Sequence, residues 1–262
     1  MAEAQLVHEV TIVVSKRIRQ RVKQFLTGAI VLLVLLGSLG EVARLGFGFD
    51  TLLGLIRLFG LGQEANVPTW YSSATLFVAA LLAALIALVR YQYRDPLALQ
   101  WSLLSLLLCL MSLDETALLH ETFSVVAAQM LLGVHDQPWY VYYAWSLPGI
   151  AIAGVILWWF STLWRGLGPE TRAGFTWAAV VYFGGVLGME VIEAVFAAVL
   201  GIRGADASPF YTAVWTTQEL MEMAGVAVLI LTLLDYLALS QITITMHSSA
   251  EVSGKTSAPS GG

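Results

Sequence analysis

Two Glu-x-x-Glu motifs stand inside long apolar stretches of this sequence, and they are formed by Glu190 with Glu193 and by Glu219 with Glu222. Residues three apart on a helix are neighbours on its surface, so each motif presents two carboxylates on one face. Like charges placed in this way repel one another, and the repulsion is stronger in a medium of low dielectric constant. A bound cation or shared protons would relieve it. The motifs therefore predict a site that holds a cation or exchanges protons.

A third acid-rich segment follows the apolar stretch 97–113 and reads Asp-Glu-x-x-x-x-His-Glu. If the helix continues unbroken through this segment, Asp114 and Glu121 share one stripe, because they are seven residues apart. Glu115 and His120 would then lie about 100° to either side of that stripe. We therefore expect Asp114 and Glu121 to face the site. Of the two remaining residues, we favour His120 over Glu115 as a member of the site. His120 and Glu121 are the predicted catalytic residues, and His120 would serve as a ligand or a proton shuttle.

Acidic residues on four predicted helices fall at a common depth. At 1.5 Å per helical residue, Glu41, Asp114, Glu190 and Glu222 each lie about 24–27 Å from the basic end of their segments. That depth is near the far edge of a hydrocarbon core about 30 Å thick. The sequence thus predicts one shared metal site with seven carboxylate ligands: Glu41, Asp114, Glu121, Glu190, Glu193, Glu219 and Glu222.

Three functions are compatible with this cluster. Several carboxylates with one imidazole suit a divalent cation of the Mn, Fe or Ca class. We favour a metal-dependent membrane enzyme that acts on a lipidic or quinone-like substrate. The first alternative is a cation- or proton-coupled transporter, because ionisable residues inside membranes commonly mark ion routes. The second is a structural subunit of a membrane complex, in which the acids pair with basic residues of partners. A purely structural explanation is also open, in which the acids reach the lipid headgroups or pair with Arg44 and Arg203.

The elements that position these residues are expected to be transmembrane helices. The chain has 262 residues, 58% hydrophobic and 12% charged, with a mean hydropathy of +0.77. A soluble domain carries about 25% charged residues, so a soluble or disordered protein is excluded. A net charge of −5 without a basic, aromatic-interleaved run argues against nucleic acid as a partner. Six stretches are long and apolar enough to span a bilayer: 25–40, 71–89, 97–113, 142–164, 175–200 and 211–239.

The predicted fold is therefore all-α, a polytopic helical bundle of about six transmembrane helices. Residues 1–24 are expected to form a basic amphipathic helix, with a signal peptide as the alternative. Residues 25–240 form the six-helix domain, in which 50–61 lies at the interface, and residues 241–262 form a disordered tail. Ten of the 13 Lys and Arg residues lie on the side of the termini, which predicts that both termini are cytoplasmic.

The sequence also gives expectations about binding partners and cellular location. Gly184 and Gly188 form a small-xxx-small pair that allows close helix packing, within the chain or in a homo-oligomer or with another protein. Membrane lipid is the other expected partner. The acidic segment combined with two Glu-x-x-Glu motifs resembles multi-pass proteins of bacterial membranes, which implies the inner membrane as the location and implies no activity.

Overall fold

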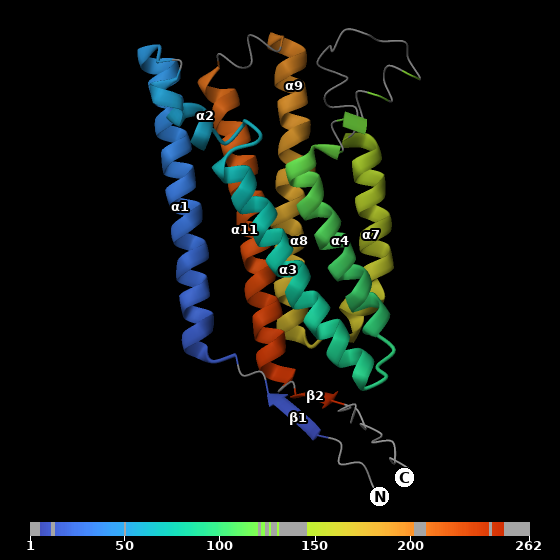
Figure 1. The fold of residues 1–262 in the computed structure, drawn as a ribbon. Helices are drawn as coiled ribbons and strands as arrows, with labels where there is room; N and C mark the ends of the chain where they lie inside the picture. The colour runs from blue at the N-terminus through green and yellow to red at the C-terminus, as the bar shows by residue number, and fades with distance from the viewer. Residues whose placement is uncertain are drawn as a thin grey trace, which may run out of the picture.

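The computed structural model describes residues 6–11, 14–49, 51–119, 122–123, 126, 130, 146–201, 208–240 and 243–248. Within these residues the protein has six helical spans, which are long and apolar enough to cross a membrane. They stand side by side in one bundle (Figure 1). The spans are α1 (Lys16–Phe47), α3 (Val67–Gln92), α4 (Ala98–Ala117), α7 (Ser146–Gly166), the continuous helix α8–η2–α9, and α11 (Pro209–Ser240). The prediction of a multi-pass all-α membrane protein is confirmed.

The fifth span is a single helix with a change of helix type in its middle. It begins as α8 (Pro169–Phe183), passes through the π-helical turn η2 (Gly184–Met189) and continues as α9 (Glu190–Leu200). Pro169 lies in the first turn of α8, where its missing N–H has no helical acceptor to lose. The glycine-rich sequence of η2 disfavours a regular helix. A local departure from α-helical hydrogen bonding is therefore expected at this point.

A short helical segment connects the first two spans. It consists of η1 (Leu52–Gly54) and α2 (Leu55–Phe59), and it corresponds to the helix expected over residues 50–61. α2 packs against α1 through its buried residue Ile56. At this contact, a Cβ added to Gly37 of α1 would lie 2.9 Å from the carbonyl oxygen of Phe59 on α2. Gly37 is thus required for the close approach of the two segments. The position of α2 at a membrane interface stays a prediction.

The apolar core extends along the bundle from Tyr71 and Met223 into the half that contains the start of α1 and the end of α11. Trp101 of α4, Ile86 of α3 and Leu233 of α11 are completely buried there. The Trp101 ring lies 5.0 Å from that of Tyr236 and 6.0 Å from that of Phe175, measured between ring centroids. α3, α4, α8 and α11 therefore meet around this tryptophan, whereas α1 and α7 lie on opposite sides of the bundle (Figure 1).

Polar contacts tie the helices together at the same end. Arg90 of α3 donates hydrogen bonds to the carboxylate of Asp95 and to the hydroxyl of Tyr236 on α11. Burial alone would raise the pKa of Asp95, but the backbone N–H of Leu97, at 2.7 Å, and the Arg90 guanidinium together hold it below its usual 3.8. Asp235 of α11 forms a second ion pair, with Arg19 of α1.

Two strands join the ends of the chain: β1 (Leu6–Thr11) pairs antiparallel with β2 (Thr243–Ser248). The prediction of a helix over 1–24 is wrong for residues 6–11, and the helix begins at Lys16. The tail predicted to be disordered contains β2, and its residues from 249 onward lie outside the described part. Both segments are rich in Val, Ile and Thr, which favour strands. Each needs a partner from the opposite end of the sequence, which local periodicity does not reveal.

Candidate functional site

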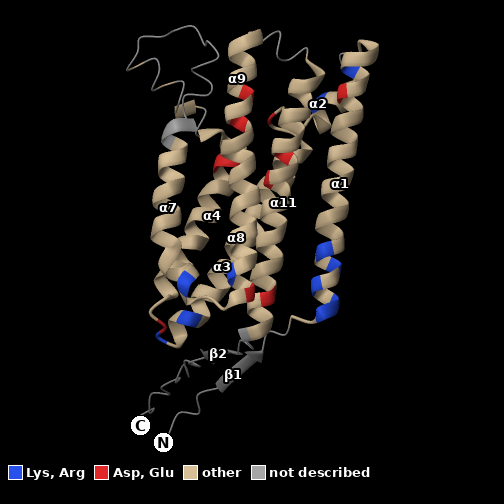
Figure 2. Ribbon diagram, turned by 180° about the vertical axis from the view of Figure 1, so that it is seen from behind, with Lys and Arg blue, Asp and Glu red and all other residues tan. Residues whose placement is uncertain are grey.

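Charged residues divide the bundle into two unlike halves (Figure 2). Most of the Lys and Arg lie where α1 starts and where α3 joins α4 and α7 joins α8; we call this the basic end. Asp235 of α11 pairs with Arg19 at the basic end, whereas the Asp and Glu residues of α4 and α9 lie in the opposite half, together with Glu219 and Glu222 of α11. Together with one glutamate from the loop before α3, they form what we call the acidic cluster. Its members are Glu64, Asp114, Glu115, Glu190, Glu193, Glu219 and Glu222.

Glu222 on α11 connects the helices of the cluster. Its carboxyl group interacts electrostatically with that of Glu115 on α4 and with those of Glu190 and Glu193 on α9. Glu219, one turn earlier on α11, interacts with Glu222, Glu115 and Glu193, and also with Glu64. Carboxyl groups from three spanning helices therefore act on one another, together with one from the loop before α3.

A tyrosine lies among these acids. Tyr182, near the end of α8, interacts electrostatically with Glu222, Glu115, Asp114 and Glu219. Its position is set by a close helix crossing: a Cβ on Gly225 of α11 would lie 2.7 Å from the backbone nitrogen of Tyr182. Only glycine allows the two backbones to approach so closely. The crossing of α8 and α11 therefore brings the tyrosine to the cluster.

The π-helical turn η2 brings the first Glu-x-x-Glu motif to α11. A Cβ on Gly185 would lie 3.0 Å from the carbonyl oxygen of Gln218 and 3.0 Å from Cγ of Glu222, so η2 lies directly on α11. Glu190 and Glu193 follow immediately and are buried, with 7% and 9% of their surface exposed. π-Helical turns are rare and occur often at functional sites. The turn thus precedes the residues for which the sequence predicts chemistry.

Hydrogen bonds orient two of the carboxylates. The hydroxyl of Tyr211 donates to Glu193, and the side-chain amide of Gln218 donates to Glu222. Oε1 of Glu193 is enclosed and has no hydrogen-bond partner among the described residues, and the same holds for Nε1 of Trp215. Glu193 is therefore a buried acid with one oxygen available to a ligand or a proton.

The loop between α2 and α3 covers the cluster. A Cβ on Gly62 would overlap the ring of Trp215, at 1.1 Å from two of its atoms, so the loop backbone lies directly against this tryptophan. Oγ1 of Thr69 donates to Glu64 at 3.3 Å. Asn66 holds the loop by donating to the carbonyl oxygens of Gly60 and Gln63. Glu64 was not predicted, because a single acid in a polar loop gives no signal in the sequence.

The structure brings together most of the predicted ligands but not all of them. Asp114, Glu190, Glu193, Glu219 and Glu222 belong to the cluster, and their role as metal ligands stays a prediction. Glu41 is buried on α1 and forms an ion pair with Arg44, with oxygen-to-nitrogen distances of 2.6 and 2.9 Å. It is not among the groups with the largest effect on Glu219 or Glu222.

The expected stripe on α4 is wrong, because α4 does not continue. It ends at Ala117, and Leu118 adopts a left-handed conformation with φ of 51°. The regular helix on which the expectation for Asp114 and Glu121 depends therefore ends at Ala117. Glu115 was the residue of this segment least expected to face the site, and it interacts with Glu219 and Glu222. His120 and Glu121 lie outside the described residues.

The described residues also bear on the predicted metal site. Among them, no group of three or more His, Cys, Asp and Glu side chains is arranged to hold a metal ion. The divalent metal and its ligand set remain a prediction.

Comparison with known proteins places the bundle in a family. The sequence matches the family described as "Domain of unknown function (DUF8692)" over residues 24–237. The chain belongs to this family. The part that matches DUF8692 contains the whole acidic cluster and neither β1 nor β2, so the family unit is the helical bundle. No curated protein and no solved structure matches the chain.

The helix expected to face Gly184 and Gly188 is α11 of the same chain. A Cβ on Gly184 would lie 2.8 Å from Cε of Met221, whereas one on Gly188 would meet nothing within 4 Å. The close contact is therefore made by Gly184 and Gly185. A homo-oligomer through this face stays a prediction.

Proposed function

We propose that the acidic cluster binds and exchanges a cation, protons included, and that the protein is a proton- or cation-coupled transporter. The observation that carries the proposal is the mutual interaction of carboxyl groups from the spanning helices α4, α9 and α11, to which the α2–α3 loop adds Glu64. The buried and unpartnered Oε1 of Glu193 adds an acceptor that a ligand or a proton would satisfy.

The energetics favour exchangeable positive charge at this place. Moving a charged carboxylate out of water costs several kcal/mol even after the surroundings relax. Among the described groups that act most strongly on Glu219 and Glu222, none is a lysine or an arginine. Protons or a bound cation would supply the missing positive charge. Interacting carboxyl groups titrate together, so binding a cation would release protons from the cluster as a whole.

Transport requires a change of access, and the structure offers a place for it. Between the cluster and the basic end, α11 presents the buried apolar residues Val226, Ile230 and Leu233. This apolar layer separates the cluster from the basic end. The π-helical turn η2 interrupts the regular hydrogen bonding of the fifth span beside Glu190, and such interruptions allow a helix to bend. Interrupted helices are also frequent at the ion sites of transporters.

The test is cation flux into proteoliposomes loaded with a pH-sensitive dye. Gradients of Na⁺, K⁺, Ca²⁺ and Mn²⁺ are applied to the wild type, to Glu222→Gln and to the control Glu170→Gln. Glu170 is an exposed acid in the first turn of α8, at the basic end, so it matches the charge change outside the cluster. We expect proton countermovement with at least one cation, lost in Glu222→Gln and kept in Glu170→Gln. Equal flux in both variants, or flux no greater than in empty liposomes, would overturn the proposal.

A metal-dependent membrane enzyme is the second candidate. It is favoured by the convergence of carboxylates from two helices, because Glu222 interacts with both Glu190 and Glu193. These residues and Glu219 would hold a divalent ion of the Mn, Fe or Ca class, with Asp114 and Glu121 completing the site and His120 moving a proton. If bound there, such an ion would activate water or polarise a substrate oxygen.

Elemental analysis of the purified protein after dialysis against a chelator tests the second candidate, because an enzyme of this kind keeps its metal, whereas a transporter exchanges its cation. A stoichiometric metal that is lost in the double variant Glu190→Ala/Glu222→Ala would support the enzyme. Substoichiometric metal that does not change in this variant would exclude it.

We also propose that the basic end faces the cytoplasm of a bacterial cell, because Lys and Arg accumulate there. In a Cys109→Ser background, a cysteine introduced at Arg94 should resist a membrane-impermeant maleimide in intact cells. One introduced at Arg57 should react. The reverse pattern would invert the orientation.

A further inference from the structure

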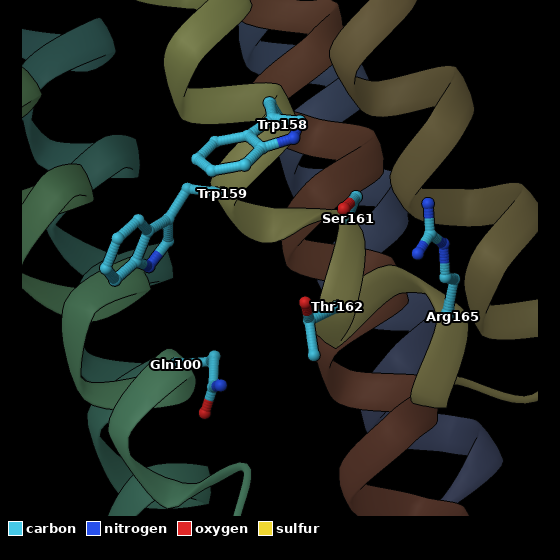
Figure 3. A pocket seen from close by; sticks show the side chains of 6 residues that line it. All are labelled: Gln100, Trp158, Trp159, Ser161, Thr162 and Arg165. Carbon is cyan, nitrogen blue, oxygen red and sulfur yellow. The ribbon is translucent and has the colours of Figure 1, made fainter.

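A cavity lies at the basic end, far from the acidic cluster, between the start of α4 and the end of α7 (Figure 3). Its volume is about 380 Å³. One lining residue, Gln100, comes from α4. The others occupy one face of α7 and are Trp158, Trp159, Ser161, Thr162 and Arg165. The cavity therefore joins a cation, neutral hydrogen-bonding groups and two large aromatic side chains.

The polar lining suits a phosphate group with further hydrogen-bonding groups attached. The guanidinium of Arg165 presents several donors in a fixed plane, a geometry that matches two phosphate oxygens at once. The hydroxyls of Ser161 and Thr162 lie between Gln100 and Arg165 (Figure 3) and are additional donors. Oε1 of Gln100 is enclosed and accepts no hydrogen bond from the described residues. It needs a ligand that brings a donor of its own.

The aromatic lining suits the membrane. Trp158 and Trp159 are 73% and 53% exposed on α7, which lies at the rim of the bundle. Tryptophan is enriched at the headgroup level of bilayers, where one part of the side chain contacts hydrocarbon and its N–H contacts polar groups. A ligand of this cavity would thus place a polar end against Arg165 and an apolar end along the tryptophans.

We propose that this cavity binds one anionic glycerophospholipid with hydroxyls on its headgroup. The phosphate contacts Arg165, Ser161 and Thr162, a headgroup hydroxyl donates to Gln100, and the acyl chains lie along Trp158 and Trp159. Charge complementarity supports this occupant, because anionic lipids attract basic segments at a membrane surface. A quinone offers carbonyl acceptors only and would leave Gln100 without a donor.

The test measures lipid binding to the purified full-length protein in a neutral detergent. Phosphatidylglycerol and phosphatidylcholine with identical acyl chains are titrated, and bound lipid is counted by native mass spectrometry beside thermal unfolding. We expect phosphatidylglycerol to bind about tenfold more tightly, because its headgroup hydroxyl donates to Gln100, whereas the quaternary ammonium of phosphatidylcholine donates no hydrogen bond and repels Arg165. Arg165→Gln should abolish the preference. Arg94→Gln, which removes the same charge from an exposed position at the same end, should retain it.

Three results would overturn the proposal. The first is equal affinity for the two lipids, and the second is an equal loss in Arg165→Gln and Arg94→Gln. The third is full competition by inorganic phosphate or glycerol 3-phosphate at the lipid concentration, which would make the cavity a site for soluble phosphate. If Arg165→Gln does not fold, Arg165→Lys and the double variant Ser161→Ala/Thr162→Val replace it, and each should weaken the binding of phosphatidylglycerol, since each alters the contacts to its phosphate. The cavity is remote from the acidic cluster, so the outcome is independent of the transport assay.

Discussion

Replacing Gly225 by alanine should destabilise the bundle at the crossing of α8 and α11. The added Cβ would lie 2.7 Å from the backbone nitrogen of Tyr182 and 2.8 Å from its Cα. Carbon atoms in contact prefer a separation of about 3.5–4.0 Å, so the helices would have to separate by about 1 Å. Backbone atoms cannot rotate away from the methyl group. Overpacking of this kind costs about 1–3 kcal/mol.

Two glycines of η2 provide matched controls for Gly225→Ala. In Gly184→Ala the new methyl meets only Cε of Met221, at 2.8 Å, and a flexible side chain can move aside. In Gly188→Ala it meets nothing within 4 Å. We therefore expect a small loss of stability for Gly184→Ala and none for Gly188→Ala. The latter variant should even gain up to about 1 kcal/mol, because alanine favours helix more than glycine does.

The assay is thermal unfolding in detergent, with reversible unfolding in a denaturing detergent as the second measure. Each kcal/mol lost should lower Tm by roughly 2–4 °C for a chain of this size. Equal stability of Gly225→Ala and Gly188→Ala would refute the close crossing. Because that crossing positions Tyr182 among the acids, Gly225→Ala should also reduce cation-dependent proton release, and Gly188→Ala should leave it unchanged.

Three further predictions concern the basic end. Because the pKa of Asp95 lies below 3.8 in the folded protein, this residue contributes stability above the unfolded pKa, and the contribution is lost as the pH falls through the lowered value. The free energy of unfolding of the wild type should therefore exceed that of Asp95→Asn at about pH 5, and the difference should disappear as the pH falls to about 2. The side chains of the ion pair Arg19–Asp235 are 39% and 44% exposed, so solvent screens their attraction. A double-mutant cycle should therefore give a coupling free energy below about 1 kcal/mol. Trp101→Ala should cost about 3–5 kcal/mol, and Trp101→Phe much less, because Nε1 has no hydrogen-bond partner among the described residues.

The spans and most of the acidic cluster could be predicted from the sequence because both depend on local patterns. An apolar stretch must form its backbone hydrogen bonds internally in a membrane, so its length alone indicates a helix. The Glu-x-x-Glu spacing likewise specifies one face of a helix wherever the helix packs. Glu190, Glu193, Glu219 and Glu222 were identified in this way.

The remaining features depend on contacts between distant segments or on exceptions to regular geometry. Leu118 favours helix by its own propensity, yet it adopts a left-handed conformation and ends α4. Glu115 was ranked last because that break was not foreseen. Glu64 joins the cluster only because the α2–α3 loop folds over Trp215. The strands β1 and β2 pair across almost the entire chain, and neither forms a ladder without the other.

The π-helical turn η2 has a consequence for the direction in which α9 points. A π-turn accommodates one more residue than the α-helical turn it replaces, and each residue rotates a helix by about 100°. Gly185 touches α11. The angle about the helix axis between Gly185 and Glu190 therefore depends on this extra residue. Without it, Glu190 and Glu193 would be turned about a quarter of a circle away from their present orientation toward Glu222. The count of residues between Gly184 and Met189, and not only their identity, decides whether the first Glu-x-x-Glu pair faces its partners.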